Sequence, residues 1–231
     1  MWDVSVLTIF PEIFTNFFQT SIIGKAQERG LLSCNTVNIR DFADPPHYKV
    51  DDTPYGGGPG MVMMVEPIVK AIRAVRESRP NNHVVLLTPG GSRFTQTKAN
   101  ELSQKDSITF VCGRYEGVDQ RVIELEVDEE LSIGDFVVMG GEVPAMLVVE
   151  ACIRLRPDVI SNKASTEHES FSPQLGEGVL VESPQYTRPD TFEEKTVPEV
   201  LLSGDHARIN QWRLQKAKAK TTHLKDKGNS K

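Results

Sequence analysis

Two continuous apolar runs constrain the fold of this chain more than any other feature. They are "HVVLLT" (His83–Thr88) and "ITFVC" (Ile108–Cys112), in which apolar residues follow one another instead of alternating with polar ones. A strand that is apolar on both sides must be covered on both faces, as a parallel strand between two layers of helices is. "DVSVLTIF" (Asp3–Phe10) and "CNTVNIR" (Cys34–Arg40) are also predicted as strands. The runs therefore predict an α/β fold with a parallel sheet.

Amphipathic stretches separate these runs, and their apolar residues recur at helical spacing. Helices are predicted over Pro11–Phe18, Ser21–Arg29 and Glu66–Ser78. A fourth predicted helix, Val143–Leu155, is apolar nearly all round. Such a helix is expected to be buried on most sides, either in the core or against a second subunit.

The composition changes after Pro157. Residues 157–190 are rich in Ser, Pro, Gly and Glu and show little periodicity, which is typical of a linker or a mobile loop. Val197–Leu202 and Asp205–Lys220 are predicted as short helices, with Ser203 or Asp205 as a suitable N-cap. We therefore expect an α/β domain over 1–160, a flexible linker over 161–190 and a basic helical domain over 191–231.

The net charge of −6 conceals a basic C-terminal end. From His206 onward, the sequence contains eight Lys and Arg residues and a single acidic residue, Asp226. Charge alone leaves two interpretations open, a solvated helix end or an arm that binds the phosphates of a nucleic acid. Trp212 and Arg213 could add base stacking and a phosphate contact, although a lone tryptophan at helical spacing is more often a core residue.

Other features exclude several classes of protein. The three cysteines are far apart, and no His/Cys pair has zinc-ligand spacing, so neither a disulfide framework nor a structural metal is expected. No apolar run approaches the ~20 residues needed to cross a membrane, and the N-terminus lacks the pattern of a signal peptide. These features predict a cytoplasmic protein.

Glycine-bearing loops directly follow the predicted buried strands, where ligands bind in open α/β sheets. They are "PGGS" (Pro89–Ser92), "GRYEG" (Gly113–Gly117) and the later part of "LSIGDFVVMGGEVP" (Leu131–Pro144). The standard phosphate motifs GxxxxGK[ST] and GxGxxG are absent, which disfavours an ordinary ATPase or NAD dehydrogenase. A further loop, "YGGGPGM" (Tyr55–Met61), either holds a ligand or only lets the chain turn.

Several blocks, read together and in order, resemble the TrmD family of bacterial tRNA (guanine-N1)-methyltransferases. The blocks are "DDTPYGGGPGMVMMVEP", "CGRYEGVDQRV", "SIGDFVVMGGEVPAM", "SFSP…YTRP" and "LLSGDHARINQWR". The resemblance implies a SPOUT-type α/β domain with a deep trefoil knot, and a homodimer with composite active sites. It implies S-adenosylmethionine as methyl donor and N1 of guanosine 37 of tRNA, preceded by another guanosine, as acceptor.

The resemblance also assigns binding residues. It implies that the cofactor pocket is lined by Leu87, Pro89, Gly113, Tyr115, Glu116, Gly117, Ile133, Gly134, Val138, Gly140, Gly141 and Pro144. We expect the RNA side to include Tyr55, Gly58, Gly60, His206, Arg208, Trp212 and Arg213, of which the three loop residues could equally be a structural turn. Magnesium dependence is a trait of the family, but the sequence shows no dedicated cluster of ligands.

The resemblance further implies two catalytic residues. Arg154 would stabilise negative charge on the guanine oxygen. The position of the family's aspartate base is occupied by Glu169, which keeps a carboxylate but adds a methylene. His168 is the reserve candidate for the base, one residue away from the family's register. Smaller departures are Gly90, Ser92, Phe136 and Gln185, and a longer linker around 173–181.

Two other functions stay open at this point. One is a SPOUT enzyme that methylates a ribose hydroxyl or another RNA base. The other is an RNA-binding relative without catalytic activity, which the replacement of aspartate by Glu169 would permit.

Overall fold

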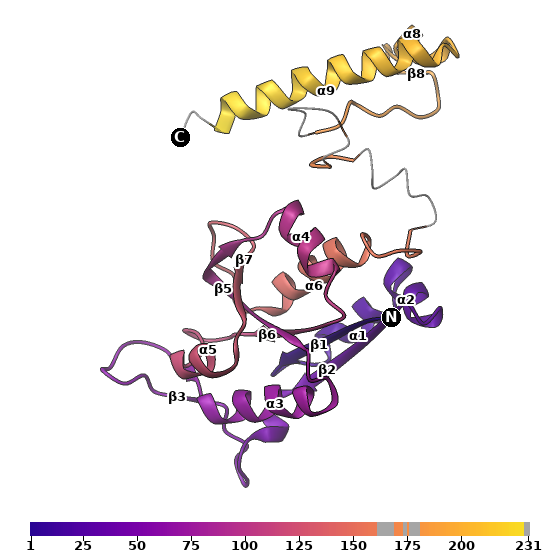
Figure 1. Ribbon diagram of the computed structural model, residues 1–231. Helices are drawn as coiled ribbons and strands as arrows, with labels where there is room; N and C mark the ends of the chain where they lie inside the picture. The colour runs from indigo at the N-terminus through magenta and orange to yellow at the C-terminus, as the bar shows by residue number, and fades with distance from the viewer. Residues whose placement is uncertain (161–168, 173–174, 176–180, 229–231) are drawn as a thin grey trace. The chain divides into compact units, whose positions relative to one another are not determined.

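The structure is a computed structural model of the 231-residue chain, and it describes residues 1–160, 169–172, 175 and 181–228 (Figure 1). The chain divides into two compact units, Met1–Ile160 and Ser161–Lys231. Within the described residues, no helix combines the length and the apolar character that crossing a membrane would require.

A five-stranded sheet of parallel strands forms the centre of the first unit (Figure 1). Its order is β2-β1-β6-β5-β7. The strands are β1 (Trp2–Thr8), β2 (Leu32–Asn38), β5 (His83–Arg93), β6 (Ser107–Cys112) and β7 (Glu129–Ser132). The predicted α/β fold with a parallel sheet is confirmed.

Helices cover both faces of this sheet, which accounts for the continuous apolar strands. Along β5, Val85 and Leu87 face one apolar core, while Val84 and Leu86 face the other. The first core is completed by α1 (Ile13–Gln19), α2 (Ser21–Glu28), α4 (Gln96–Ser103) and α6 (Glu142–Ile153). The second core is completed by the 3-10 helix η1 (Ile39–Phe42), α3 (Val65–Ser78) and α5 (Gln120–Glu126).

Strand β5 is longer than the apolar run that predicts it. Its pairing with β7 is interrupted between Leu87 and Ser92 and then resumes, with Ser92 opposite Leu131 and Arg93 opposite Ser132. The "PGGS" loop is therefore an irregularity within a strand, and its chain turns back onto β7.

The chain that leaves β7 returns across the sheet. Gly141 donates its backbone N–H to the carbonyl of Gly113 at 2.9 Å, directly after β6. Because β5 lies between β7 and β6, the segment 133–141 crosses the carboxyl end of β5. This crossing brings the ends of three strands together and fixes where α6 begins.

Helix α6 is buried on one side only, although it is apolar nearly all round. Ala145, Val148 and Val149 are fully buried, whereas Val143 is 63% and Leu147 is 44% exposed. The core of the chain therefore covers only part of the helix that was predicted to be buried on most sides.

A short two-stranded ladder flanks the glycine loop at residues 55–61. Strands β3 (Asp51–Asp52) and β4 (Val62–Met63) pair antiparallel on either side of it. The backbone of Met63 also bonds to the chain after β6, accepting from Asp119 at 3.0 Å and donating to Gly117 at 2.9 Å. The loop is thereby attached to the end of the central sheet.

The described part of the second unit contains a short hairpin and two helices. The hairpin pairs β8 (Thr191–Phe192) with β9 (Lys195–Thr196), and α8 (Glu199–Leu202) and α9 (His206–Gly228) follow. Asp205 caps α9 by accepting from the N–H groups of Ala207 and Arg208, each at 3.1 Å, as one of the two predicted caps. Helix α9 runs past the predicted end at Lys220.

We predict different costs for two adjacent glycine substitutions in the irregular part of β5. A Cβ on Gly91 would lie 2.3 Å from the backbone nitrogen of Leu131, whereas a Cβ on Gly90 would meet nothing closer than Thr88 Oγ1 at 4.0 Å. Gly91→Ala should lower the free energy of unfolding by about 2 kcal/mol or more, since overpacking against backbone cannot relax through a side chain. Gly90→Ala, the matched control, should stay within about 0.5 kcal/mol of the wild type in urea unfolding. Equal stabilities of the two variants would contradict the close packing of β5 on β7.

Candidate active site

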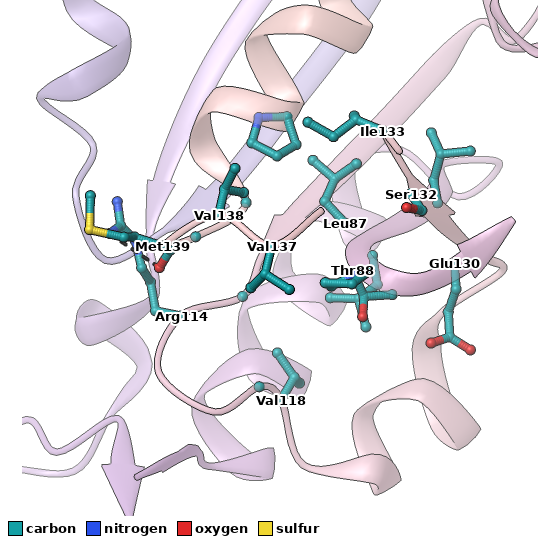
Figure 2. Close-up of a pocket in the computed structure, with 18 of the residues that line it drawn as sticks. Leu87, Thr88, Arg114, Val118, Glu130, Ser132, Ile133, Val137, Val138 and Met139 are labelled. Atoms are coloured by element: carbon teal, nitrogen blue, oxygen red, sulfur yellow. Dashed lines mark hydrogen bonds between the residues drawn. The ribbon is translucent and has the colours of Figure 1, made fainter. Parts of the chain in front are cut away.

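A pocket of about 430 Å³ opens at the carboxyl ends of β5, β6 and β7 (Figure 2). Three segments contribute to it: residues 86–89 within β5, residues between 113 and 123 after β6, and residues between 130 and 144, which begin in β7. Its volume lies within the range of about 300–1,000 Å³ that small-molecule sites occupy. The lining includes every residue that the resemblance assigns to the cofactor except Gly134.

The segment 113–118 adopts a conformation that few residues tolerate. Tyr115 has a positive φ of 59°, and Gly117 has a φ of 132°. A non-glycine residue at positive φ is uncommon and costs conformational energy. The segment is held in this shape by β4 and its neighbours, because Glu116 donates its N–H to the carbonyl of Met61 at 2.9 Å.

The backbone explains the glycines of the loop at 55–61. Gly56, Gly57, Gly58 and Gly60 all have positive φ, at 85°, 77°, 130° and 78°. Gly60 has a second role, since a Cβ there would lie 2.4 Å from Glu116 Oε1. The loop therefore turns the chain, and at Gly60 it also leaves room for a pocket residue. Tyr55, the first residue of this loop, is 99% exposed.

Close packing explains the glycines of the third segment. A Cβ on Gly141 would lie 2.6 Å from the Cα of Cys112, and a Cβ on Gly134 would lie 2.6 Å from the ring of Phe136. Phe136 itself lines the pocket, so Gly134 supports the wall without being part of it. The missing side chain at each of these positions leaves room for neighbouring atoms of the protein. From the sequence alone, these glycines were associated with the approach of a ligand.

The pocket combines apolar surface with a few charges. Leu87, Ile133 and Pro144 are apolar, while Glu116 and Glu130 contribute carboxylates. Figure 2 shows Glu130 on one side of the pocket and Arg114 on the other. The pocket can therefore take a ligand with an apolar or aromatic part and a positively charged part.

No reactive thiol contributes to this pocket. Cys112 is fully buried at the end of β6, and burial, aided by the carboxylate of Glu142, raises the pKa of its thiol well above the ordinary value. Burial also raises the pKa of Cys34 and of Cys152 to about 12. All three thiols are therefore protonated near neutral pH and are poor nucleophiles.

Arg154 lies away from this pocket, at the other end of α6. The helix begins at Glu142 beside the pocket, and Arg154 follows its last residue, Ile153. At 1.5 Å per residue, the helix separates Pro144 from Arg154 by about 15 Å. Arg154 instead lines a second hollow, of about 430 Å³, with residues of α1 and α2 such as Phe17 and Ile22.

Glu169 belongs to the second unit and is half-buried in a turn in which its carbonyl accepts from the N–H of Ser172 at 3.1 Å. His168 lies outside the described residues. Within the first unit, the pocket lining does not include Arg154.

The predicted RNA-side residues fall into two groups. Tyr55, Gly58 and Gly60 belong to the glycine loop of the first unit. His206, Arg208 and Arg213 are exposed on α9. Trp212 is half-buried, its ring 6.3 Å from that of Tyr186 and covered by Lys216 Nζ at 5.9 Å from the ring centroid.

Several pocket residues were not singled out from the sequence. They are Thr88, Arg114, Val118, Gln120, Glu130, Ser132, Val137 and Met139, with a few apolar neighbours. Most of them lie inside the glycine-bearing loops that indicated the site. Their position in these loops was the only feature of the sequence that could have pointed to them. Within the described part of the chain, no group of three or more His, Cys, Asp or Glu side chains is placed to hold a metal ion.

Fold and site together define an α/β protein with a small-molecule pocket at the carboxyl edge of a parallel sheet, built from three glycine-bearing loops. Residues 2–227 match the sequence profile of the family described as tRNA (Guanine-1)-methyltransferase TrmD. The chain therefore belongs to the TrmD family.

Relatives at about half identity are similar to this chain along most of their length. A tRNA (guanine-N(1)-)-methyltransferase of Carboxydothermus hydrogenoformans is 49% identical over 93% of this chain and 82% of its own. Proteins of the same name from Treponema denticola and Metamycoplasma arthritidis are each 51% identical over 94% of this chain. They are covered over 86% and 91% of their own length.

Proposed function

We propose that this protein transfers a methyl group from S-adenosylmethionine to N1 of guanosine 37 in tRNA. The observation that carries the proposal is the convergence of three loops, distant in sequence, on one pocket whose lining includes residues that the resemblance assigns to the cofactor. The family and the names of the relatives supply the reaction. A tRNA substrate implies that the enzyme acts in the cytoplasm.

The residues of the pocket fit S-adenosylmethionine. Leu87, Ile133 and Pro144 offer apolar surface for an adenine ring, and the carboxylates of Glu116 and Glu130 suit a cation. When bound, the donor supplies a methyl group on a positively charged sulfonium. The pocket's part is to hold that group in line with the acceptor, because displacement at carbon depends on alignment.

The remaining task for the protein is to remove the proton of guanine N1. We propose Glu169 as the base and Arg154 as the group that stabilises negative charge on the guanine oxygen. A carboxylate is a much weaker base than deprotonated guanine N1, so stabilisation of the developing charge on the guanine matters. His168 remains the second candidate for the base.

A dimer would bring these parts together. Since α6 separates the pocket from Arg154 by about 15 Å, this spacing favours an arginine supplied by a second copy of the chain. The apolar surface left exposed near α6, at Val143, Leu147 and Met139, is of the kind that a second subunit covers. Two copies related by a two-fold axis, with their α6 helices antiparallel, would place Arg154 of one near the pocket of the other.

We propose that the crossing of 133–141 over the end of β5 is part of the trefoil knot that the family implies. The chain after β7 reaches the end of β6, while residues 88–93 of β5 turn back onto β7. A threaded connection of this kind is rare in proteins. It would bind the three loops of the pocket into a single assembly.

The second unit would bind the tRNA. Exposed cations on α9, among them Arg208, Arg213 and Lys216, suit the phosphates of an RNA stem. We keep the proposed division into a catalytic domain over 1–160, a linker over 161–190 and a tRNA-binding domain over 191–231. We assign no residue to magnesium, and its effect on the rate of methyl transfer is to be measured.

The function is tested by methyl transfer to a tRNA transcript that carries guanosines at positions 36 and 37. We expect 1-methylguanosine at position 37 by nucleoside mass spectrometry, and none on a transcript with adenosine at that position. Glu169→Gln should lower the single-turnover rate by about a hundredfold or more, since a positioned base contributes at least this much. The tRNA affinity of this variant serves as the control and should stay near that of the wild type.

Three other outcomes separate the alternatives. Methylation of a ribose or of another base would favour a different SPOUT activity. A protein that binds S-adenosylmethionine and tRNA without turnover would be a non-catalytic relative. An undiminished rate for Glu169→Gln would leave the reaction intact and transfer the role of base to another group, beginning with His168.

The composite site is tested by mixing two inactive variants. Arg154→Gln removes the charge at one end of α6, and Val138→Arg places a cation in the pocket, where it should repel a sulfonium. A heterodimer of the two variants keeps one intact site if pocket and Arg154 come from different protomers. We therefore expect activity to return after joint refolding, to about a quarter of the wild-type value by random pairing. Two inactive parents that stay inactive when mixed would mean that each protomer uses its own Arg154.

A further inference from the structure

A buried carboxylate stands behind the wall of the pocket and takes no part in the mechanism above. Glu142, the first residue of α6, is 1% exposed. Its Oε2 lies 2.8 Å from Nε of Arg114, a residue of the pocket wall. The contact is an ion pair without the alignment of a hydrogen bond, and among the described residues neither atom has a hydrogen-bond partner. Each of these two buried atoms therefore depends on the other for compensation of its charge.

The other oxygen of Glu142 is attached to the end of β1. Thr8 Oγ1 donates to Glu142 Oε1 at 2.8 Å and accepts from the N–H of Phe10 at 2.9 Å. Phe10 in turn supports the arginine, because the Arg114 guanidinium lies 4.7 Å from the centroid of its ring. The position of Glu142 in the first turn of a helix also favours a negative charge there. The carboxylate is thus held from two sides and by the helix itself.

The same pair explains why residue 140 is glycine. A Cβ there would lie 2.2 Å from Nε of Arg114 and 2.6 Å from Oε2 of Glu142. The backbone of Gly140 therefore lies directly against the ion pair. Arg114 also reaches the carbonyl of Met139 by a long hydrogen bond of 3.5 Å, and Figure 2 shows the two residues adjacent at one side of the pocket.

These contacts join two of the three loops that form the pocket. Arg114 belongs to the segment after β6, whereas Met139 and Gly140 belong to the segment after β7. Glu142 lies between the two segments and connects both to β1 through Thr8. A shift of the carboxylate would therefore move both walls together.

We propose that Glu142 is a positioning residue for the methyl donor, which holds Arg114 and thereby sets the spacing of the loops 113–118 and 136–141. Thr8 orients the carboxylate of Glu142. Gly140 leaves room for the Arg114–Glu142 ion pair because it has no side chain. The inference rests on the proposed function, because it takes the pocket to be the donor site. Neither Glu142 nor Thr8 lines the pocket, so both act through Arg114 and the backbone.

The test measures binding of S-adenosylhomocysteine by calorimetry, together with thermal unfolding, on the full-length protein. Glu142→Gln keeps the size of the side chain and removes the charge that holds Arg114. We expect its Kd to rise about tenfold or more, since small displacements of positioning groups have effects of this size. The KM for S-adenosylmethionine should rise in parallel, with a smaller change in kcat.

Glu126→Gln is the matched control. Glu126 is also a buried carboxylate, but it does not line the pocket, and it pairs with Arg73 and Arg76 of α3 at 2.6 Å each. Its substitution should lower the melting temperature while leaving the Kd unchanged. A Glu142→Gln protein that is also less stable but binds with wild-type affinity would overturn the inference.

A second pair of variants decides the matter if Glu142→Gln does not fold. Thr8→Val removes the hydroxyl that orients Glu142 and should raise the Kd about threefold. This is less than the roughly tenfold or more that a hydrogen bond to a charged group is worth, because the hydroxyl acts on the ligand only through Glu142. Thr109→Val is its control, because Thr109 is equally buried, accepts from Asn82, and lies in the same sheet outside the pocket lining. Equal Kd values for these two variants would overturn the inference. Failure of the wild type to bind S-adenosylhomocysteine would instead count against the proposed function.

Discussion

The close contact between Gly141 and the end of β6 is the constraint on which the rest of the structure depends. The N–H of Gly141 bonds to the carbonyl of Gly113, and a Cβ on Gly141 would collide with the backbone of Cys112. This contact draws the chain across the carboxyl end of β5 and starts α6 at that point. The pocket forms because loops after three strands meet there, and Arg154 lies far from it because α6 leads away. This backbone contact thus places the pocket at the start of α6 and Arg154 at its other end.

Hydrophobic patterning predicted the parts of the fold that it determines physically. Val84–Leu87 are buried on both faces of the sheet, and the sequence shows this as an uninterrupted apolar run. Helices α4 and α5 were not predicted, because each is only seven or eight residues long and carries many polar side chains. The pairing of Ser92 and Arg93 with β7 was missed as well, since it depends on a partner strand nearly 40 residues later.

The candidate site was predictable in its loops but not in its internal contacts. Glycines mark the three segments, yet the reason for each glycine comes from tertiary neighbours, such as the ring of Phe136 at Gly134 or the Arg114–Glu142 pair at Gly140. Nothing in the local sequence connects Thr8 with Glu142, because their hydrogen bond joins residues 134 positions apart. The order of the blocks along the chain indicated the family, whereas the separation of pocket and Arg154 required the length and direction of α6.

The central claim is that three loops form a single binding site for the methyl donor. Amide hydrogen exchange of the wild-type protein, with and without S-adenosylhomocysteine, tests it most directly. The account predicts slower exchange in 87–90, 113–118 and 133–141 together, with no change in α3, which lies away from the pocket. Protection confined to one of these loops, or centred on residues 16–23 beside Arg154, would contradict it.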